Sequence, residues 1–242
     1  MATSNLVHEQ IETGVTSLED RSWLVLVAAV LPVPLTMVFF IVHSIVTGTP
    51  REAYGLPAAY LIYGLANLVT VSGVYVFLSA DERASVFRFT RPSLTELGWA
   101  VAGFVVGLGV YQVTSRVSAL FGYELQGLSY SLTTPSTIAI VVIGAVIIAP
   151  ITEEILYRGL ILGTLLARGF GIMGAVALMT ALFAVIHLPN FGVAAVLFIS
   201  VWGILPAVLR LRFDNLSGAV FMHTANNIYT YLVVVGLGLG SF

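Results

Sequence analysis

Charged residues interrupt the most apolar part of this chain. Glu153, Glu154 and Arg158 lie between the runs IAIVVIGAVIIA and LILGTLLA. Charges inside a membrane-spanning segment are costly and usually mark a functional site. Glu154 and Arg158 are four residues apart, so on a helix they share a face and can pair. Glu153 then lies about 100° round the helix without a local partner, which suits a general base or a metal ligand. The structural alternative is an ion cluster that only locks helices together.

Two further polar motifs occur in later apolar segments. FAVIH places Phe183 and His187 four residues apart, and HTANN places His223 and Asn227 four residues apart. Members of each pair share one face of a helix. Three helices could therefore bring a carboxylate, two imidazoles and an amide together inside one bundle, although a single histidine near a helix end is more often structural.

Two chemical schemes suit these residue types. In the first, Glu153 with His187 acts as a general base on water, and His223 and Asn227 donate hydrogen bonds to the oxygen of a tetrahedral intermediate. In the second, Glu153, His187 and His223 are three ligands of a zinc ion (Zn) with an open position for water. Both schemes hydrolyse a peptide bond without a covalent intermediate, and the sequence does not choose between them.

The elements that must position these residues are predicted to be membrane helices. Hydrophobic residues make up 58% of the 242 and charged residues only 9%, against about a quarter charged in soluble domains. Continuous apolar runs, without alternation, exclude a β-barrel and predict an all-α polytopic transmembrane helix bundle. A spanning helix needs roughly 20 apolar residues. The seven candidate spans, with an eighth span or a re-entrant segment as the alternative, are about 23–47, 56–80, 96–121, 136–167, 170–188, 191–209 and 216–240.

The domain organisation that follows is simple. We expect a polar N-terminal tail over 1–22 and a single transmembrane domain over 23–242, with its catalytic core at about 136–242. The chain contains no Cys, which excludes disulfides, thiolate nucleophiles and Cys-based zinc sites. It has no basic tract, so we expect no nucleic-acid partner.

The arginines predict the orientation, because cytoplasmic loops carry the excess of positive charge. Placing the 81–95 loop inside puts the N-terminus inside and the C-terminus outside. Arg51 and Arg116 are then left on the outer side. The arginines gathered on the inner side are Arg21, Arg83, Arg88, Arg91, Arg168, Arg210 and Arg212. We expect an integral multi-pass protein of the cell membrane, with the lipid bilayer as its surroundings.

A shared site requires that His187 and His223 lie at a similar depth in the membrane. Straight, full-length helices would place His187 and His223 in different halves of the bilayer. We therefore expect the fifth and sixth spans to form a hairpin that stops short of the outer surface, with the turn LPNFG at 188–192 buried in protein. Pro150 could also tilt the part of the fourth span that carries Glu153.

The three motifs together resemble a known family. The chain is similar to the CPBP intramembrane proteases, also called the CAAX-protease and bacteriocin-processing (Abi) family, and so to type II CAAX prenyl endopeptidases. The family pattern is EExxxR, FxxxH and HxxxN on separate membrane helices. It reads here as EEILYR at 153–158, FAVIH at 183–187 and HTANN at 223–227. HExxH, GxSG and GxGD, which mark other intramembrane proteases, are absent.

The resemblance implies roles for the matching residues. Glu153 would activate water with the help of His187, and His223 and Asn227 would form the oxyanion site. Glu154 and Arg158, with Phe183 of FAVIH, would support the site or bind a substrate carboxylate. The implied substrate is a membrane-associated polypeptide, for example a lipidated CAAX-like protein or a leader peptide. The family has been described both as glutamate-type and as metalloproteases, so zinc stays open.

Two other functions remain as alternatives. Intramembrane Glu, His and Arg also serve proton-coupled transporters, but the sequence shows no inverted repeat of the kind that transporters carry. A non-catalytic membrane protein that confers immunity by binding is the other alternative. Loss of peptide cleavage on substitution of Glu153 would distinguish the protease from both.

Overall fold

The computed structural model of the protein describes residues 16–239. Helices and their connections account for this whole part of the chain, which contains no strand, so the predicted all-α fold is confirmed. The elements in chain order are η1 Thr16–Arg21, α2 Ser22–Val30, α3 Pro32–Thr47, η2 Arg51–Ala53, α4 Leu56–Phe77, α5 Ala80–Val86, α6 Leu94–Leu120, α7 Pro135–Val141, η3 Val142–Ile148, α8 Ala149–Glu153, η4 Glu154–Ile161, α9 Leu162–Ala167, α10 Ile172–Val185, α11 Leu188–Trp202, α12 Ile204–Phe213, α13 Ser217–Ile228 and η5 Tyr229–Val234. Here η1 and η2 are 3₁₀ helices, and η3, η4 and η5 are π-helices.

Four helical stretches are long and apolar enough to cross a membrane. A fifth is added if the bent pair Leu18–Val30 and Pro32–Thr47, which meet at 43°, forms one span. The predicted span 170–188 contains α10, which has only 14 residues. That length gives about 21 Å of helix, less than the roughly 30 Å of a hydrocarbon core. The four stretches are Leu56–Phe77, Leu94–Leu120, Pro135–Ala167 and Leu188–Phe213.

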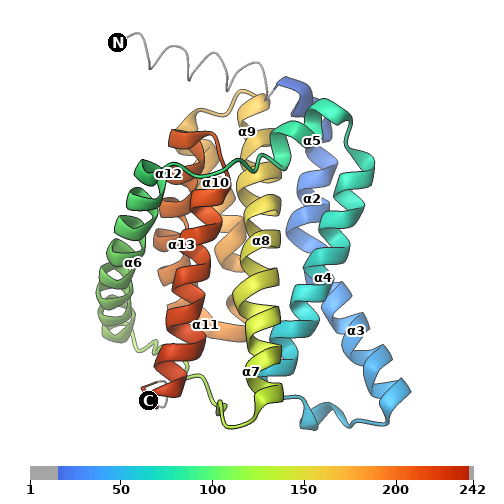
Figure 1. Cartoon of the computed structure of the whole chain (residues 1–242), viewed down its shortest axis with the longest axis vertical. Helices are drawn as coiled ribbons and strands as arrows, with labels where there is room; N and C mark the ends of the chain where they lie inside the picture. Colours follow the sequence, from blue (N-terminus) through green and yellow to red (C-terminus); the bar gives the residue numbers. More distant parts are fainter. Residues whose placement is uncertain (1–15, 240–242) are drawn as a thin grey trace.

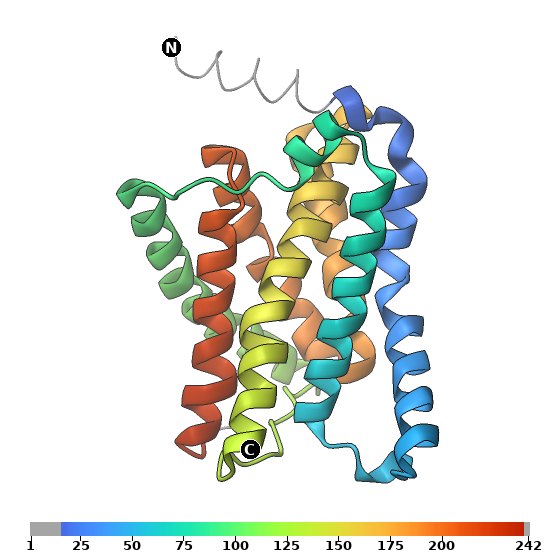
Figure 2. The same ribbon diagram turned by 45° about the vertical axis from the view of Figure 1, so that its right-hand side comes forward.

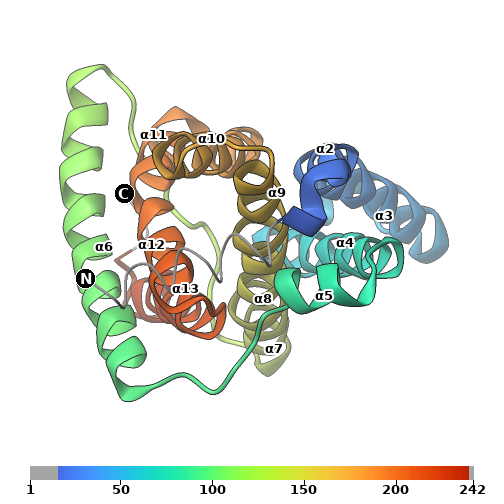
Figure 3. The same cartoon turned by 90° about the horizontal axis from the view of Figure 1, so that it is seen from above.

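The stretch Pro135–Ala167 is a continuous central column of 33 residues, made of α7, η3, α8, η4 and α9. Seen from above, it stands between the α2–α5 group and the α10–α13 group, and α6 lies on the far side of the latter (Figure 3). Gly144 allows the column to touch α4, because a Cβ at this position would lie 2.7 Å from the Leu61 Cα. The column therefore presents residues to both halves of the bundle.

The described part of the predicted polar tail is attached to this column. Residues 1–15 of the tail lie outside the described residues. Leu18, in η1, is fully buried and faces Gly163 of α9. Arg168 Nη1 donates to the Glu19 carbonyl at 3.2 Å and to Ser22 Oγ at 2.7 Å. Residues 16–22 are thus packed against the bundle.

The α10–α11 hairpin ends within the length of the bundle, well short of the level reached by α7 (Figures 1 and 2). The expectation that its turn is buried is wrong, because Leu188, Pro189 and Asn190 are exposed. Helical hydrogen bonds explain the exposure: the N–H groups of Asn190 and Phe191 both donate to the His187 carbonyl. The backbone of the turn is satisfied internally and needs no cover from neighbouring helices.

Most of the arginines belong to segments that lie at one end of the bundle: η1, α5, the segment after α5, the end of α9 and the end of α12 (Figure 1). Arg88 Nε lies 2.8 Å from Asp214 Oδ2, and Arg210 Nη1 lies 2.5 Å from Asp214 Oδ1. Arg210 Nη2 also donates to the Ser85 carbonyl at 3.3 Å. These contacts join α5, the segment after it and the end of α12. The cytoplasmic placement of this end stays a prediction.

Glu82 ties the start of α5 to Arg21, the last residue of η1. Its carboxylate accepts two hydrogen bonds from Arg21, at 2.6 and 3.0 Å, and one from the Ser79 N–H at 2.6 Å. Ser79 Oγ in turn accepts from the Glu82 N–H, which completes a capping box. The hydrogen bonds from Arg21, followed by those from Ser79, lower the pKa of Glu82.

This lowered pKa predicts a stability that depends on pH in the acid range. The contribution of Glu82 is fully present above the unfolded value of about 4.3 and is lost as the pH falls through the folded pKa. We expect Glu82→Gln to reduce stability at neutral pH by about 1 kcal/mol and to flatten the decline in acid. Thermal unfolding in detergent at a series of pH values measures both effects. Equal acid slopes in the two proteins would contradict this account.

Candidate active site

Glu154 and Arg158, four residues apart on the central column, form an ion pair inside the protein. Arg158 Nη1 lies 3.1 Å from Glu154 Oε1, and both side chains are 0% exposed. Arg158 Nη2 donates to the Gly203 carbonyl at 2.9 Å, and the guanidinium lies 4.5 Å from the centre of the Phe183 ring. The pair predicted from the sequence is therefore formed, and it links the central column to α10 and to the α11–α12 junction.

His223 joins this pair to Glu153. Its Nδ1 lies 2.8 Å from Glu154 Oε1, and its Nε2 lies 3.8 Å from Glu153 Oε2. A proton on Nδ1 that is donated to Glu154 leaves Nε2 as the ring atom facing Glu153. The indole of Trp202 packs edge-on against the imidazole, with ring centres 5.0 Å apart. Glu153, which has no partner within its own segment, thus meets a group from α13.

Asn227 lies one turn beyond His223 and binds the column through a buried backbone carbonyl that has no donor within its own helix. Its Nδ2 donates to the Ala145 carbonyl at 2.8 Å. This carbonyl needs a donor for a local reason: the Ala149 N–H bonds to the Gly144 carbonyl instead, and Pro150 has no N–H. The π-helix η3 and the proline together create an acceptor that Asn227 fills, and π-segments are frequent at functional sites.

His187 is connected to the other residues through Phe183. His187 Nδ1 lies 2.7 Å from the Phe183 carbonyl, and the two rings are 4.9 Å apart. The Phe183 ring is also 6.3 Å from the His223 ring and 4.8 Å from the Tyr157 ring. The structure thus joins Glu153, Glu154, Arg158 and His223 by polar contacts and brings His187 next to them across an aromatic ring.

The arrangement does not fit a three-ligand metal site. Within residues 16–239, no group of three His, Asp or Glu side chains is placed to hold one ion. Of the proposed ligands, Glu153 and His223 face each other, whereas His187 Nδ1 is engaged by the Phe183 carbonyl. We therefore derive no step through a metal from these residues.

Several site residues carry no motif signal that a sequence reading could use. Trp202 and Tyr157 contact the motif residues through their rings. Gly203 supplies the carbonyl for Arg158, and a Cβ there would lie 2.9 Å from Thr180 Cγ2. Trp202 and Gly203 lie in an apolar run where aromatic and small residues are ordinary, and Tyr157 occupies an unspecified position of the EExxxR pattern. Only the tertiary fold identifies these residues.

Buried polar atoms around these residues lack a protein partner within the described part of the chain. Leaving such an atom unpaired costs about 1–3 kcal/mol. Five such atoms belong to the Glu154–Arg158 pair or to side chains that pack near it, and water or polar groups of a substrate could serve as their partners. The atoms are Glu154 Oε2, Tyr157 OH, Arg158 Nε, Thr180 Oγ1 and Trp202 Nε1.

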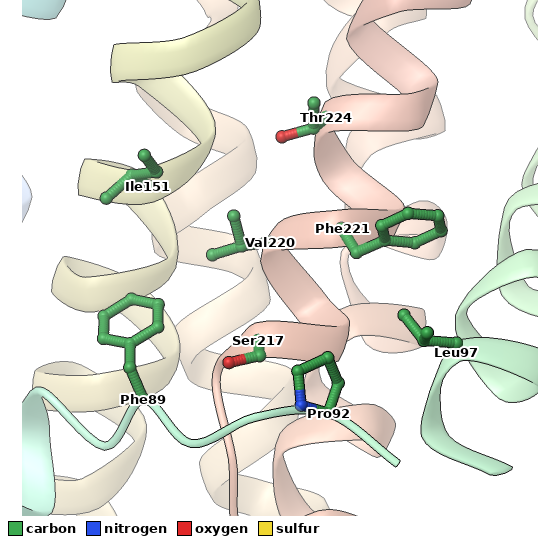
Figure 4. A pocket seen from close by; sticks show the side chains of 8 residues that line it. All are labelled: Phe89, Pro92, Leu97, Ile151, Ser217, Val220, Phe221 and Thr224. Atoms are coloured by element: carbon green, nitrogen blue, oxygen red, sulfur yellow. The ribbon is translucent and has the colours of Figure 1, made fainter. Parts of the chain in front are cut away.

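An apolar hollow of about 570 Å³ flanks the site without reaching its charged groups. It lies between α8, α13, the start of α6 and the segment before it (Figure 4). Ile151 and Thr224 line it and stand close in sequence to Glu153 and His223, which are themselves buried. The full lining is Phe89, Pro92, Leu97, Ile151, Ser217, Val220, Phe221 and Thr224.

Comparison with known proteins identifies the same part of the chain. Residues 135–229 match the model of the family described as Type II CAAX prenyl endopeptidase Rce1-like. No curated protein and no solved structure matches the chain. The matched region contains all three motifs and runs from the start of α7 to the first residue of η5. The resemblance read from the motifs is confirmed.

The buried Glu154–Arg158 ion pair predicts a large loss of stability when one of its two partners is removed. Arg158→Met leaves the Glu154 carboxylate buried without its cation, and we expect a loss of about 3–5 kcal/mol of stability. The double variant Glu154→Gln/Arg158→Met should lose less, because no uncompensated charge remains. Unfolding in mild detergent measures both. Arg116→Met, at an exposed position, is the control and should stay within about 0.5 kcal/mol of wild type. If Arg158→Met were as stable as the double variant, or more stable, this account of the Glu154–Arg158 ion pair would be contradicted.

Proposed function

We propose that this chain is an intramembrane endopeptidase that uses Glu153 to activate water, on the basis of the match of residues 135–229 to the Type II CAAX prenyl endopeptidase Rce1-like family. The family supports a hydrolase of the CAAX-protease type acting on membrane-associated polypeptides. To this we add which residues of the chain carry out the reaction and what each of them does.

The approach of Glu153 to His223 carries the proposal. A separation of 3.8 Å between Glu153 Oε2 and His223 Nε2 is too long for a direct hydrogen bond. A water beside the two atoms can lie about 2.8 Å from each. The unpartnered polar atoms nearby fit a site that receives water and a peptide group. Both side chains are buried, so the water would be held by fixed groups in a low dielectric.

The proposed reaction is a direct hydrolysis. Glu153 takes a proton from the water while the water oxygen attacks the scissile carbonyl carbon, giving a tetrahedral oxyanion. Glu153 then passes the proton to the leaving amine as the C–N bond breaks. The products are a new carboxylic acid and a free amine, and no covalent enzyme intermediate forms.

His223 and Asn227 are proposed as donors to the oxyanion. With His223 protonated, the buried group of two carboxylates, one guanidinium and one imidazolium is neutral, which suits a low-dielectric site. Its Nδ1–H is held by Glu154, and its Nε2–H is available to the oxyanion. Asn227 uses one N–H for the Ala145 carbonyl and has a second for the substrate. His187, held at Nδ1 by the Phe183 carbonyl, keeps Nε2 for the water.

The substrate is proposed to be a lipidated or leader-bearing polypeptide that is cut near its C-terminus or its membrane junction. Arg158 and Glu154 support the site, and Phe183 packs against Arg158. A cytoplasmic N-terminus in the cell membrane completes the proposal. The site would then open towards the cytoplasmic face.

Substitution of the proposed base tests the function directly. We expect Glu153→Gln to lower peptide cleavage by at least about 10²-fold, the scale of general-base catalysis, because an amide cannot accept the proton. Purified wild type and variant are incubated with lipidated and plain membrane peptides, and products are read by mass spectrometry. Glu124→Gln, at an exposed position, is the matched control and should cleave like wild type.

Two outcomes would refute parts of the proposal. Full cleavage by Glu153→Gln would remove this residue as the base. A broad peptide set left uncut by wild type would favour a binding or immunity protein. A parallel sample with a chelator separates metal-dependent from metal-free cleavage.

A further inference from the structure

A second buried carboxylate lies at the arginine-rich end of the bundle, outside the residues that match the family. Glu96, in the first turn of α6, is 3% exposed. Within residues 16–239, no arginine or histidine forms an ion pair with it. Three contacts from N–H groups take the place of a cation. Asn215 Nδ2 lies 3.1 Å from both carboxylate oxygens, and the Gly218 N–H donates to Oε1 at 2.8 Å.

Glu96 binds the helix that carries His223 and Asn227. Gly218 is the second residue of α13, so its N–H is one of the donors that a helix leaves unpaired at its start. Glu96 also lies in the first turn of its own helix, where its N–H donates to Ser93 Oγ at 3.1 Å. A carboxylate at the N-termini of two helices is stabilised by both helix dipoles.

Asn215 fixes the same junction from the other side. Its Oδ1 accepts from the N–H groups of Thr90 and Ser217, and its Nδ2 donates to the Thr90 carbonyl as well as to Glu96. Ser217 Oγ also donates to the Thr90 carbonyl, at 2.7 Å. The start of α13 is thus held at several points to the segment that leads into α6.

Gly218 is required for this contact. A Cβ at position 218 would lie 2.7 Å from both Cγ and Oε1 of Glu96. These atoms belong to a buried side chain whose carboxylate accepts hydrogen bonds from Asn215 and Gly218, so it has little freedom to move. The close approach and the hydrogen bond therefore depend on the same glycine.

We propose that Glu96, Asn215 and Gly218 form a clamp that positions α13, and with it His223 and Asn227, for the reaction at Glu153. The effect on activity rests on the proposed function. Glu96 is a positioning residue: it holds the helix start five residues before His223. A 1 Å misplacement of a catalytic group can lower a rate by about 10²-fold. The clamp should thus act on kcat, because the substrate-binding groups remain.

Glu96→Gln and Glu82→Gln form a matched pair of variants. Their comparison separates an effect on the position of α13 from an effect on the stability of the whole protein. Glu96→Gln keeps the size of the side chain but places an N–H₂ group against an Asn215 donor. Glu82→Gln changes another buried carboxylate that caps a helix start in this end of the bundle. The hydrogen bonds of the Glu82 carboxylate come from Arg21 and Ser79, and not from α13. Gly218→Ala tests the same clamp by displacing Glu96.

The readouts are hydrogen exchange of the α13 backbone and steady-state cleavage per folded protein. For Glu96→Gln and Gly218→Ala we expect faster exchange over 217–223, with kcat lowered about 10–100-fold and KM changed less than about twofold. For Glu82→Gln we expect exchange over 217–223 and kcat like wild type. Unchanged α13 exchange, or unchanged kcat with only a lower unfolding temperature, would overturn the clamp. If wild type cleaves nothing, the proposed protease function fails, and the exchange data still decide whether the clamp holds α13.

Discussion

The burial of Arg158 and Glu154 is the constraint on which the rest of the structure depends. An unpaired charge in a low-dielectric interior costs several kcal/mol, so each charged atom must meet a counter-charge or a hydrogen-bonding group. Glu154 meets both Arg158 and His223, and Arg158 meets the Gly203 carbonyl. These partners come from α13 and from the α11–α12 junction. The requirement to neutralise two residues of the column thus fixes the positions of its neighbours.

A similar requirement acts on the backbone of the column. Pro150 and the π-helix η3 leave the Ala145 carbonyl without a backbone donor, and Asn227 supplies one. His223 and Asn227, one turn apart on α13, therefore bind the column at two heights, through a carboxylate and through a carbonyl. This double attachment fixes the rotation of α13 about its own axis. Rotation decides whether His223 Nε2 faces Glu153, so the proline contributes to the geometry of the site without touching it.

The sequence predicted the helical class and the Glu154–Arg158 pair, because both follow from local rules: continuous apolar runs and spacing by one turn. It did not predict that His223 contacts both glutamates, since that depends on the distance between α13 and the column. The expectation of a buried LPNFG turn was wrong because helical bonds to the His187 carbonyl satisfy that backbone in place. The roles of Glu153, His187, His223 and Asn227 stay predictions. Trp202 and Gly203 could not be singled out among the many similar residues of apolar helices.

The capping-box pattern at Ser93 and Glu96 shows how a local signal can hide a tertiary one. Ser93 and Glu96 have the S-x-x-E spacing of a capping box, and in the structure Ser93 Oγ accepts the Glu96 N–H. The Glu96 side chain, however, turns to the Gly218 N–H and to Asn215. A residue that would normally cap its own helix thus serves another one. The part of the chain that matches the family includes α13 but not α6, so the start of its last motif helix is held by a residue outside the match. The N-terminal half therefore supplies contacts that position the motif helices, and substitutions there can affect the site at a distance.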